Sequence, residues 1–411
     1  MNKKILLSLV LVLVIILLGG GYYVLIVQKA APAAAPSTSS TNTSVFPTDS
    51  NRPLGGSSSG GGFGELTATG TPGSNSTNNQ LASRFSRLST DPIASVAALG
   101  RGATSSVWYI EKNTGHLYRT NAEGAGEIAS NTTIPKILDL VMAKPGNPFI
   151  IRYNKDGRPQ NYLATLATTS TELSGRFLPQ SAYGFAISPD RNSFAFLEVV
   201  NNKTQLVTSD WQYKKPTVLA SSDLDELTLN WVATSTILLT TKPSATVPGY
   251  TYSFDLKTKQ LTRLIDNVPG LSILPSPDGK HILYSGSGSN RPFLAVYDLK
   301  KQVVNRISLP TLVNKCVWAS DSLTVYCGAP TEIPSSSYPD NWLSGEVSLN
   351  DKLWQVNATT GSSQLLFNPS LQDNKATFDV YQIALNEALD RLYIINKIDL
   401  SLWVLDLRLG F

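Results

Sequence analysis

A strand-forming unit that recurs along most of the chain limits the possible folds more than any other feature. Its sharpest copy is Ser276-Pro-Asp-Gly-Lys-His-Ile-Leu-Tyr-Ser285, in which an Asp-Gly turn leads into a strand over residues 280–285. A second strand over 293–298 follows. Repeats of roughly 40–45 residues with this strand content are typical of β-propeller blades. The pattern therefore predicts an all-β propeller over residues 80–411.

The number of blades follows from the spacing of the repeats. Innermost strands are expected to begin near residues 94, 136, 183, 226, 270, 313 and 379. The last repeat is one strand short at the C-terminus, whereas the segment 80–89 precedes the first repeat and resembles the outer-strand segment 260–265. We expect 80–89 to supply the missing outer strand and to remove an exposed sheet edge. The prediction is a seven-bladed propeller of four-stranded blades.

The N-terminal residues predict a membrane anchor. Lys3 and Lys4 precede a stretch of 23 uncharged residues, 5–27. A helix of that length reaches about 34 Å, enough to cross a hydrocarbon core of about 30 Å. The lysines favour a cytoplasmic N-terminus and export of the remainder. We therefore expect a single-pass transmembrane signal-anchor helix over 1–28, and a cleaved signal peptide with small residues at 33–35 is the alternative.

Residues 29–79 are rich in Ser, Thr, Asn, Gly, Pro and Ala. A segment of this composition buries too little apolar surface to offset its conformational entropy, so a disordered linker is expected. A flexible chain of this length has a reach of about 35–45 Å. The expected location is therefore the cytoplasmic membrane, with the propeller held on its extracytoplasmic side.

Two copies of the repeat carry a family resemblance. The segment 276–284 and, more loosely, Ser188-Pro-Asp-Arg-Asn-Ser-Phe-Ala-Phe196 resemble the repeat of TolB-type and related WD-repeat-like bacterial propellers. The turns at 233–236 and 319–322 depart from this pattern. The resemblance covers 80–411 and implies a propeller fold and recognition of a protein or a glycan outside the cytoplasm. It implies no catalytic residues, because the repeat motif is structural.

Composition argues against several kinds of chemistry. The formal net charge of +4 is small and evenly spread, which does not favour nucleic-acid binding. With two cysteines and two histidines, few ligands exist for a metal site, and no metal or cofactor is predicted. His116 and His281 lie at turn-to-strand junctions without a neighbouring nucleophile. The acidic segment 223–226 lies between two blades, where polar residues are expected in any case. The sequence thus predicts that the protein is not an enzyme.

The expected function is that of a non-enzymatic interaction module of the cell envelope, bound to the membrane by its N-terminal helix. Its partner would be an envelope protein or a surface glycan. Two alternatives stay open. One is an envelope enzyme of the glycan hydrolase or lyase type, with a site at the channel mouth. The other is a structural subunit of a pilus or secretion assembly.

The two cysteines flank a predicted hairpin that turns around Asp321-Ser322. A two- or four-residue loop centred there places Cys316 opposite Cys327, with Cα atoms about 4.5–5.5 Å apart and within reach of a disulfide. A three-residue loop would put the sulfurs on opposite faces of the sheet. Because an exported domain meets oxidising conditions, we expect a disulfide, and two buried thiols are the alternative.

The sixth blade is longer than its neighbours by about twenty residues, and the excess falls at 329–349, on the face that carries the connections between blades. Loops of this length are often functional, and Tyr and Trp are enriched at binding hot spots. We therefore expect Tyr338, Asp340 and Trp342 to form part of a binding surface. The alternative is a lid whose aromatic side chains cover the end of the propeller core.

Overall fold

The computed structural model describes residues 84–100, 105–120, 124–144, 148–167, 170–371 and 377–408. The predicted anchor, 1–28, and the predicted linker, 29–79, lie outside these residues. Within the described ranges, no helix is long and apolar enough to cross a membrane.

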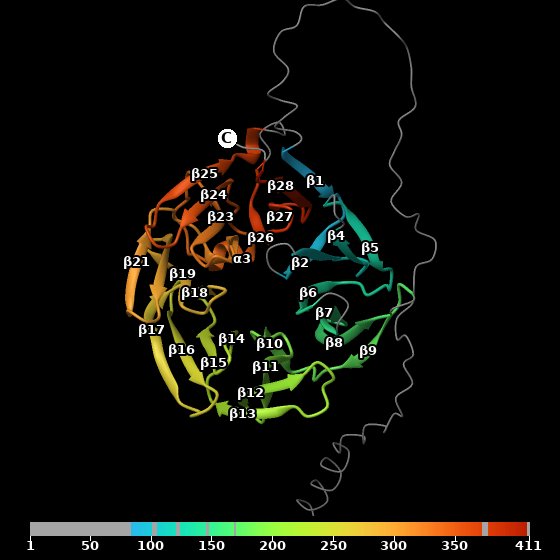
Figure 1. Ribbon diagram of the computed structural model, residues 1–411. Helices are drawn as coiled ribbons and strands as arrows, with labels where there is room; N and C mark the ends of the chain where they lie inside the picture. Colours follow the sequence, from blue (N-terminus) through green and yellow to red (C-terminus); the bar gives the residue numbers. More distant parts are fainter. Residues whose placement is uncertain are drawn as a thin grey trace, which may run out of the picture. The chain divides into compact units, whose positions relative to one another are not determined.

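Seven antiparallel sheets of four strands form the blades of a propeller (Figure 1). Blade 1 consists of β2 (Ile93–Leu99), β3 (Ser106–Glu111), β4 (Leu117–Thr120) and β5 (Gly126–Ser130). Blade 2 consists of β6 (Ile137–Met142), β7 (Phe149–Lys155), β8 (Arg158–Leu166) and β9 (Leu173–Phe177). Blade 3 consists of β10 (Ala182–Ile187), β11 (Ser193–Val200), β12 (Lys203–Asp210) and β13 (Thr217–Ser222).

Blade 4 consists of β14 (Leu227–Ala233), β15 (Thr236–Thr241), β16 (Pro248–Asp255) and β17 (Leu261–Pro269), and blade 5 of β18 (Ser272–Pro275), β19 (His281–Gly288), β20 (Arg291–Asp298) and β21 (Val303–Ile307). Blade 6 consists of β22 (Cys316–Trp318), β23 (Thr324–Pro330), β24 (Asp351–Asn357) and β25 (Ser363–Phe367), with the short helices η3 (Val313–Lys315), α3 (Asp340–Ser344) and η4 (Pro369–Leu371). The seven inner strands begin within three residues of the predicted positions, so the predicted fold class is confirmed for the propeller.

Blade 7 combines the two ends of the described chain. Its strands are β26 (Val380–Asn386), β27 (Arg391–Asn396), β28 (Leu402–Asp406) and β1 (Phe85–Ser89). The outer strand β1 pairs antiparallel with β28, from Phe85 opposite Leu405 to Ser89 opposite Leu402. Figure 1 shows β1 in blue beside β28 in red. The predicted closing strand is therefore confirmed over the described part of 80–89.

An aromatic cluster fastens the closing strand. Phe85 is 3% exposed, and its ring stacks on Trp403 of β28 with 4.9 Å between the ring centroids. The same ring lies 4.9 Å from Phe367 of β25 and 5.5 Å from Phe378, measured between centroids. Because Phe367 belongs to blade 6, a single side chain of β1 joins blades 6 and 7.

The polar residues of the repeat motif build the turn between the first two strands of a blade. Ser276 donates from Oγ to Asp278 at 2.6 Å and accepts the backbone N–H of His281 at 3.0 Å. Gly279 has φ +69°, and a Cβ there would lie 2.6 Å from the carbonyl oxygen of Val232. A side chain at this position would therefore collide with the neighbouring blade. The motif is structural, as the sequence indicated.

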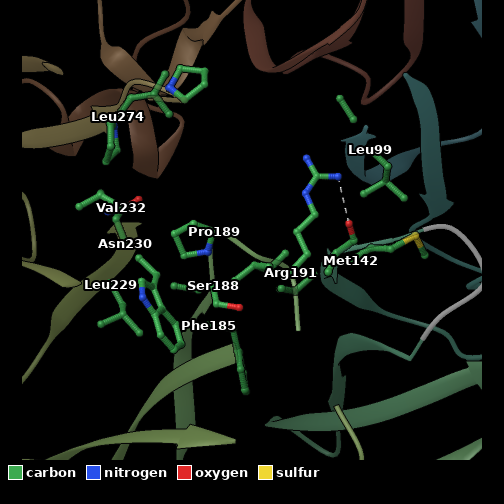
Figure 2. Close-up of a pocket in the computed structure, with 18 of the residues that line it drawn as sticks. Leu99, Met142, Phe185, Ser188, Pro189, Arg191, Leu229, Asn230, Val232 and Leu274 are labelled. Carbon is green, nitrogen blue, oxygen red and sulfur yellow. Dashed lines mark hydrogen bonds between the residues drawn. The ribbon is translucent and has the colours of Figure 1, made fainter. Parts of the chain in front are cut away.

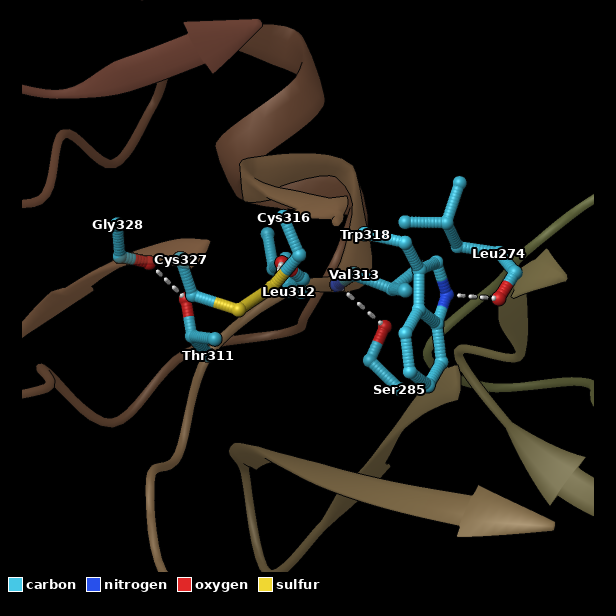
Figure 3. Close-up of a disulfide and its surroundings, with 9 residues drawn as sticks. All are labelled: Leu274, Ser285, Thr311, Leu312, Val313, Cys316, Trp318, Cys327 and Gly328. Atoms are coloured by element: carbon cyan, nitrogen blue, oxygen red, sulfur yellow. Dashed lines mark hydrogen bonds between the residues drawn. A yellow bond between two sulfur atoms is a disulfide. The ribbon is translucent and has the colours of Figure 1, made fainter. Parts of the chain in front are cut away.

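A disulfide joins Cys316 of β22 to Cys327 of β23 (Figure 3). The two residues are directly opposite each other, with a Cα–Cα distance of 4.1 Å, and the hairpin turns through Asp321 and Ser322 as predicted. The inner strand β22 has only three residues, so the covalent bond supplements few backbone hydrogen bonds. A bond that closes a loop of this size stabilises the fold by about 3 kcal/mol in the loop-entropy account. The predicted disulfide is confirmed.

Replacing Phe85 of β1 with alanine tests directly whether this side chain closes the ring of blades. We expect Phe85→Ala to lower the free energy of unfolding by about 3–5 kcal/mol, because it leaves a cavity between two blades. The matched control is Phe177→Ala, in the outer strand β9, whose side chain is 48% exposed and whose loss should cost less than about 1 kcal/mol. Urea denaturation followed by tryptophan fluorescence measures both. Equal losses for the two variants would contradict closure through Phe85.

Candidate functional site

The propeller has two chemically different channel ends. Every inner strand begins on the face that carries the connections between blades, and it ends in the turn to the second strand. One cavity is lined by the ends of inner strands and the turns that follow them, and another by their beginnings. We call these the turn-end cavity and the loop-end cavity.

The turn-end cavity has a volume of about 410 Å³ and receives residues from the inner strands of blades 1 to 5. Most of the residues that line it are apolar, among them Leu99, Met142, Phe185, Trp231 and Leu274, but polar atoms make up more than half of the surface exposed to the cavity. Pro189 and Pro277, which occupy the same place in two copies of the repeat motif, also line it. A concave site that combines apolar side chains with polar groups is a common form of a ligand site in a protein.

One guanidinium group enters this cavity. Figure 2 shows the side chain of Arg191 extending from the turn of blade 3 toward Leu99 and Met142. Its Nη1 donates to the carbonyl oxygen of Ala143 at 3.4 Å. Its backbone has φ +61° and is held by a hydrogen bond from its N–H to the oxygen of Ser188 at 2.8 Å. A guanidinium offers five N–H donors and suits a carboxylate or a carbonyl acceptor.

The carboxylate of Asp190, in the same turn, accepts hydrogen bonds from within the turn. Ser188 donates from Oγ to Asp190 at 2.5 Å, and this hydrogen bond, with one from the backbone of Asn192, lowers the pKa of Asp190. A carboxyl group with a lowered pKa stays ionised at neutral pH and is unsuited to act as a general acid. The turn therefore positions Arg191 without contributing a proton donor.

The long loop of blade 6 lies between β23 and β24, as predicted, but its aromatic residues point inward. Tyr338 and Trp342 are 0% and 1% exposed and pack with Leu312 and Leu349. Asp340 is partly buried and accepts the backbone N–H of Ala245 at 3.0 Å. This packing matches the alternative of a lid over the end of the core. A binding role for the three residues stays a prediction, and contact with the two aromatic rings would require the loop to open.

A group of buried charges lies beneath this lid. Lys315, Asp351 and Asp379 are all 0% exposed. The Lys315 ammonium donates to Asp351 at 2.6 Å and also to Asp379. The indole N–H of Trp342 donates to Asp379 at 3.0 Å, and the backbone N–H of Leu349 donates to the same carboxylate at 3.0 Å. The lid is thus held by a carboxylate that also pairs with the lysine.

Sequence reasoning missed this group, because its three members are far apart in the chain and each lies at or just before the start of a strand, where polar residues are common. One lysine faces two carboxyl groups, so one negative charge is in excess when both are ionised. Burial raises the pKa of Asp351 to about 6, despite the opposing effect of Lys315. The cluster is therefore sensitive to mild acid.

The other ionisable residues singled out in the sequence do not converge on either cavity. His116 is buried, 3.7 Å from the carboxylate of Glu111, and His281 lies 3.9 Å from Asp298. Asp223 and Glu226 form exposed ion pairs with lysines. Among the described residues, no three His, Cys, Asp or Glu side chains are grouped to hold a metal ion.

Known structures share the fold. The chain is similar to an oligogalacturonate lyase in complex with manganese, at 12% identity and a TM-score of 0.50, covering 77% of this chain and 96% of that one. It is also similar to oligogalacturonate lyase from Vibrio parahaemolyticus, at 12% identity and a TM-score of 0.51, covering 78% and 93%. TolB from Acinetobacter baumannii matches at 15% identity and a TM-score of 0.41, covering 75% and 78%. No protein-family model and no curated protein sequence matches the chain.

These comparisons define a seven-bladed β-propeller whose structural neighbours include TolB and oligogalacturonate lyase. They also correct one expectation. The sequence predicted that the protein is not an enzyme, on the ground that no catalytic residues are apparent. This prediction is contradicted, because the solved structures with a similar fold include enzymes.

The buried charges predict a dependence of stability on pH. An acid whose pKa is higher in the folded chain than its ordinary value, about 4, stabilises the fold below that value. This contribution is lost as the pH rises through about 6. The Asp351→Asn variant carries a neutral group of similar shape at all pH values. We expect the stability of the wild type relative to this variant to fall by roughly 2 kcal/mol between about pH 4.5 and 7.5.

Urea denaturation of both proteins across this pH range measures the difference. A constant difference, or one that grows with pH, would show that Asp351 is ionised throughout and would contradict the assignment.

Proposed function

We propose that the protein is a binding module of the cell envelope that takes an apolar segment of a partner protein into its turn-end cavity. The observation that carries the proposal is the cavity itself, which combines apolar residues from five blades with exposed polar atoms and the guanidinium of Arg191. Apolar side chains of the partner would be buried against Phe185 and Trp231. An acidic group or a chain carboxylate of the partner would accept hydrogen bonds from Arg191.

The disulfide supports a location outside the cytoplasm. Bonds such as Cys316–Cys327 persist where the surroundings are oxidising, and they are uncommon in cytosolic proteins. The uncharged stretch 5–27 with its two preceding lysines supports export by an N-terminal membrane anchor. In this proposal the propeller is displayed at the outer side of the cytoplasmic membrane.

An envelope enzyme of the glycan-lyase type is the second candidate. It is favoured by the two oligogalacturonate lyases that have the same propeller fold. Such an enzyme would need ionisable groups that reach the sugar.

Photo-crosslinking in intact cells tests the first candidate. A benzoylphenylalanine placed at Leu229, in the wall of the cavity, should crosslink a partner protein that mass spectrometry then identifies. We expect the substitutions Asn230→Trp, which fills the cavity, and Arg191→Gln each to reduce the crosslinked product at least about tenfold. The matched control, Lys112→Gln with Lys397→Gln at the opposite channel end, should leave the product unchanged.

Crosslinking that is indifferent to the cavity substitutions would refute the proposed site. Cleavage of polygalacturonate by the purified protein, with an unsaturated sugar as product, would instead assign the lyase function.

A further inference from the structure

The loop-end cavity, at the opposite end of the channel, has a volume of about 460 Å³ and lies among blades 7, 1 and 2. Its lining includes Lys112 from the turn after β3, Lys397 from the turn after β27, and Tyr381 of the inner strand β26. None of these residues belongs to the site proposed above. The inference below is therefore independent of the protein partner at the turn end.

The two lysines occupy equivalent places in neighbouring blades. The backbone N–H of Lys112 donates to the oxygen of Pro92 at 2.8 Å, and that of Lys397 donates to the oxygen of Asp379 at 2.6 Å, in each case just before an inner strand. Lys242 makes the same backbone contact in blade 4, to Glu226. The two turns therefore lie at the same end of the channel, and both lysines line the loop-end cavity.

Lys112 and Lys397 differ from Lys242 in the groups that lie near their ammonium nitrogens. The Lys242 ammonium pairs with the Glu226 carboxylate at 2.6 Å. In the part of the chain that the structure describes, neither Lys112 nor Lys397 has a carboxylate within 4.0 Å of its ammonium nitrogen, and Lys397 contacts the Trp342 ring instead. The one carboxylate in the cavity lining, Asp399, pairs with Arg87 at 3.0 Å. Asp139, next to the lining residue Leu138, adds a negative charge near Tyr381 and, after burial, contributes to the raised pKa of that phenol. Among the lining residues themselves, the two lysines leave positive charge in excess.

The remaining lining residues are apolar or aromatic. Tyr381 is 40% exposed, and Leu138 and Ile398 are 44% and 52% exposed. Aromatic rings of this kind pack against the C–H faces of sugar rings, and the phenol adds a hydrogen-bond donor and acceptor. Apolar side chains that stay this exposed around a concave, charged site are characteristic of a binding surface.

Backbone N–H groups at the rim of the loop-end cavity are already hydrogen-bonded within the protein, which disfavours pairing with a peptide strand. The N–H of Ile93 donates to Leu400 at 2.8 Å, and that of Ile137 donates to Lys112 at 2.9 Å. A peptide that adds as a strand needs unpaired backbone groups at a sheet edge. Recognition here depends on side chains instead, namely on two point charges and an aromatic platform.

We propose that the loop-end cavity binds an anionic glycan, with carboxylate or sulfate groups paired to Lys112 and Lys397 and a sugar ring on Tyr381. Carboxylate and sulfate present the same chemistry to a lysine, and the experiment distinguishes them. A module at the outer membrane face would in this way hold a charged surface polymer at one end of the channel while the other end stays accessible.

Isothermal titration of the purified full-length protein tests this with four probes: a hyaluronan hexasaccharide, a dextran sulfate oligosaccharide, a neutral dextran oligosaccharide and hexaglutamate. We expect one or both anionic sugars to bind and the neutral sugar to fail. Affinity should weaken as salt is added, because the charges are exposed. Binding of hyaluronan alone assigns a carboxylated glycan, and binding of dextran sulfate alone assigns a sulfated one.

Variants of Lys112, Lys397 and Tyr381 test which side chains bind the glycan. Lys112→Gln with Lys397→Gln should weaken binding at least about tenfold, and so should Tyr381→Ala, whereas Tyr381→Phe keeps the ring and should retain most of the affinity. The matched control is Lys214→Gln with Lys215→Gln, an exposed lysine pair in the loop between β12 and β13. Melting temperatures within a few degrees of the wild type show that the variants are folded.

Three results would overturn the proposal. They are the absence of binding by both anionic sugars, equal weakening in the control variant, and hexaglutamate binding that is lost with the lysines but insensitive to Tyr381→Ala. The last result would assign the cavity to an acidic peptide instead.

Discussion

Antiparallel pairing of β1 with β28 turns a row of seven blades into a closed ring. Without β1, the edge of β28 would present unpaired backbone groups, and Phe367, Phe378 and Trp403 would lose the ring that packs among them. The two ends of the described chain are 322 residues apart at the contact between Arg84 and Asp406, so the closing contacts stabilise the whole ring. Both channel-end cavities need this closure, because their walls come from several blades.

The two ends of the channel carry different turns. In blades 3 and 5, the turn after the inner strand has the Ser-Pro-Asp motif, whose serine and aspartate are hydrogen-bonded within the turn, and Pro189 and Pro277 line the cavity around Arg191. The opposite end carries turns of variable length and charge. It holds the lysines of the loop-end cavity and, in blade 6, a lid fixed on a buried carboxylate.

The sequence was sufficient to predict the features that depend on local spacing. The blade count follows from repeat length, the closing strand from a missing fourth strand, and the disulfide from the register of one hairpin between Cys316 and Cys327. The direction of the side chains in the lid could not be predicted, because loop length says nothing about whether Trp342 faces water or the core. Lys315, Asp351 and Asp379 meet only in three dimensions. The same is true of the cavity around Arg191, whose walls come from five inner strands.

The claim of a ring closed by the N-terminal strand is tested most directly by native-state hydrogen exchange of the propeller. The account predicts that the amides of β1 and β28 that are hydrogen-bonded between these strands exchange as slowly as those of β11 and β15, in the middle of blades 3 and 4, because closure makes the ring unfold as one cooperative unit. Rapid exchange at β1 with a free energy of opening near zero, alongside slow exchange at β11 and β15, would contradict it.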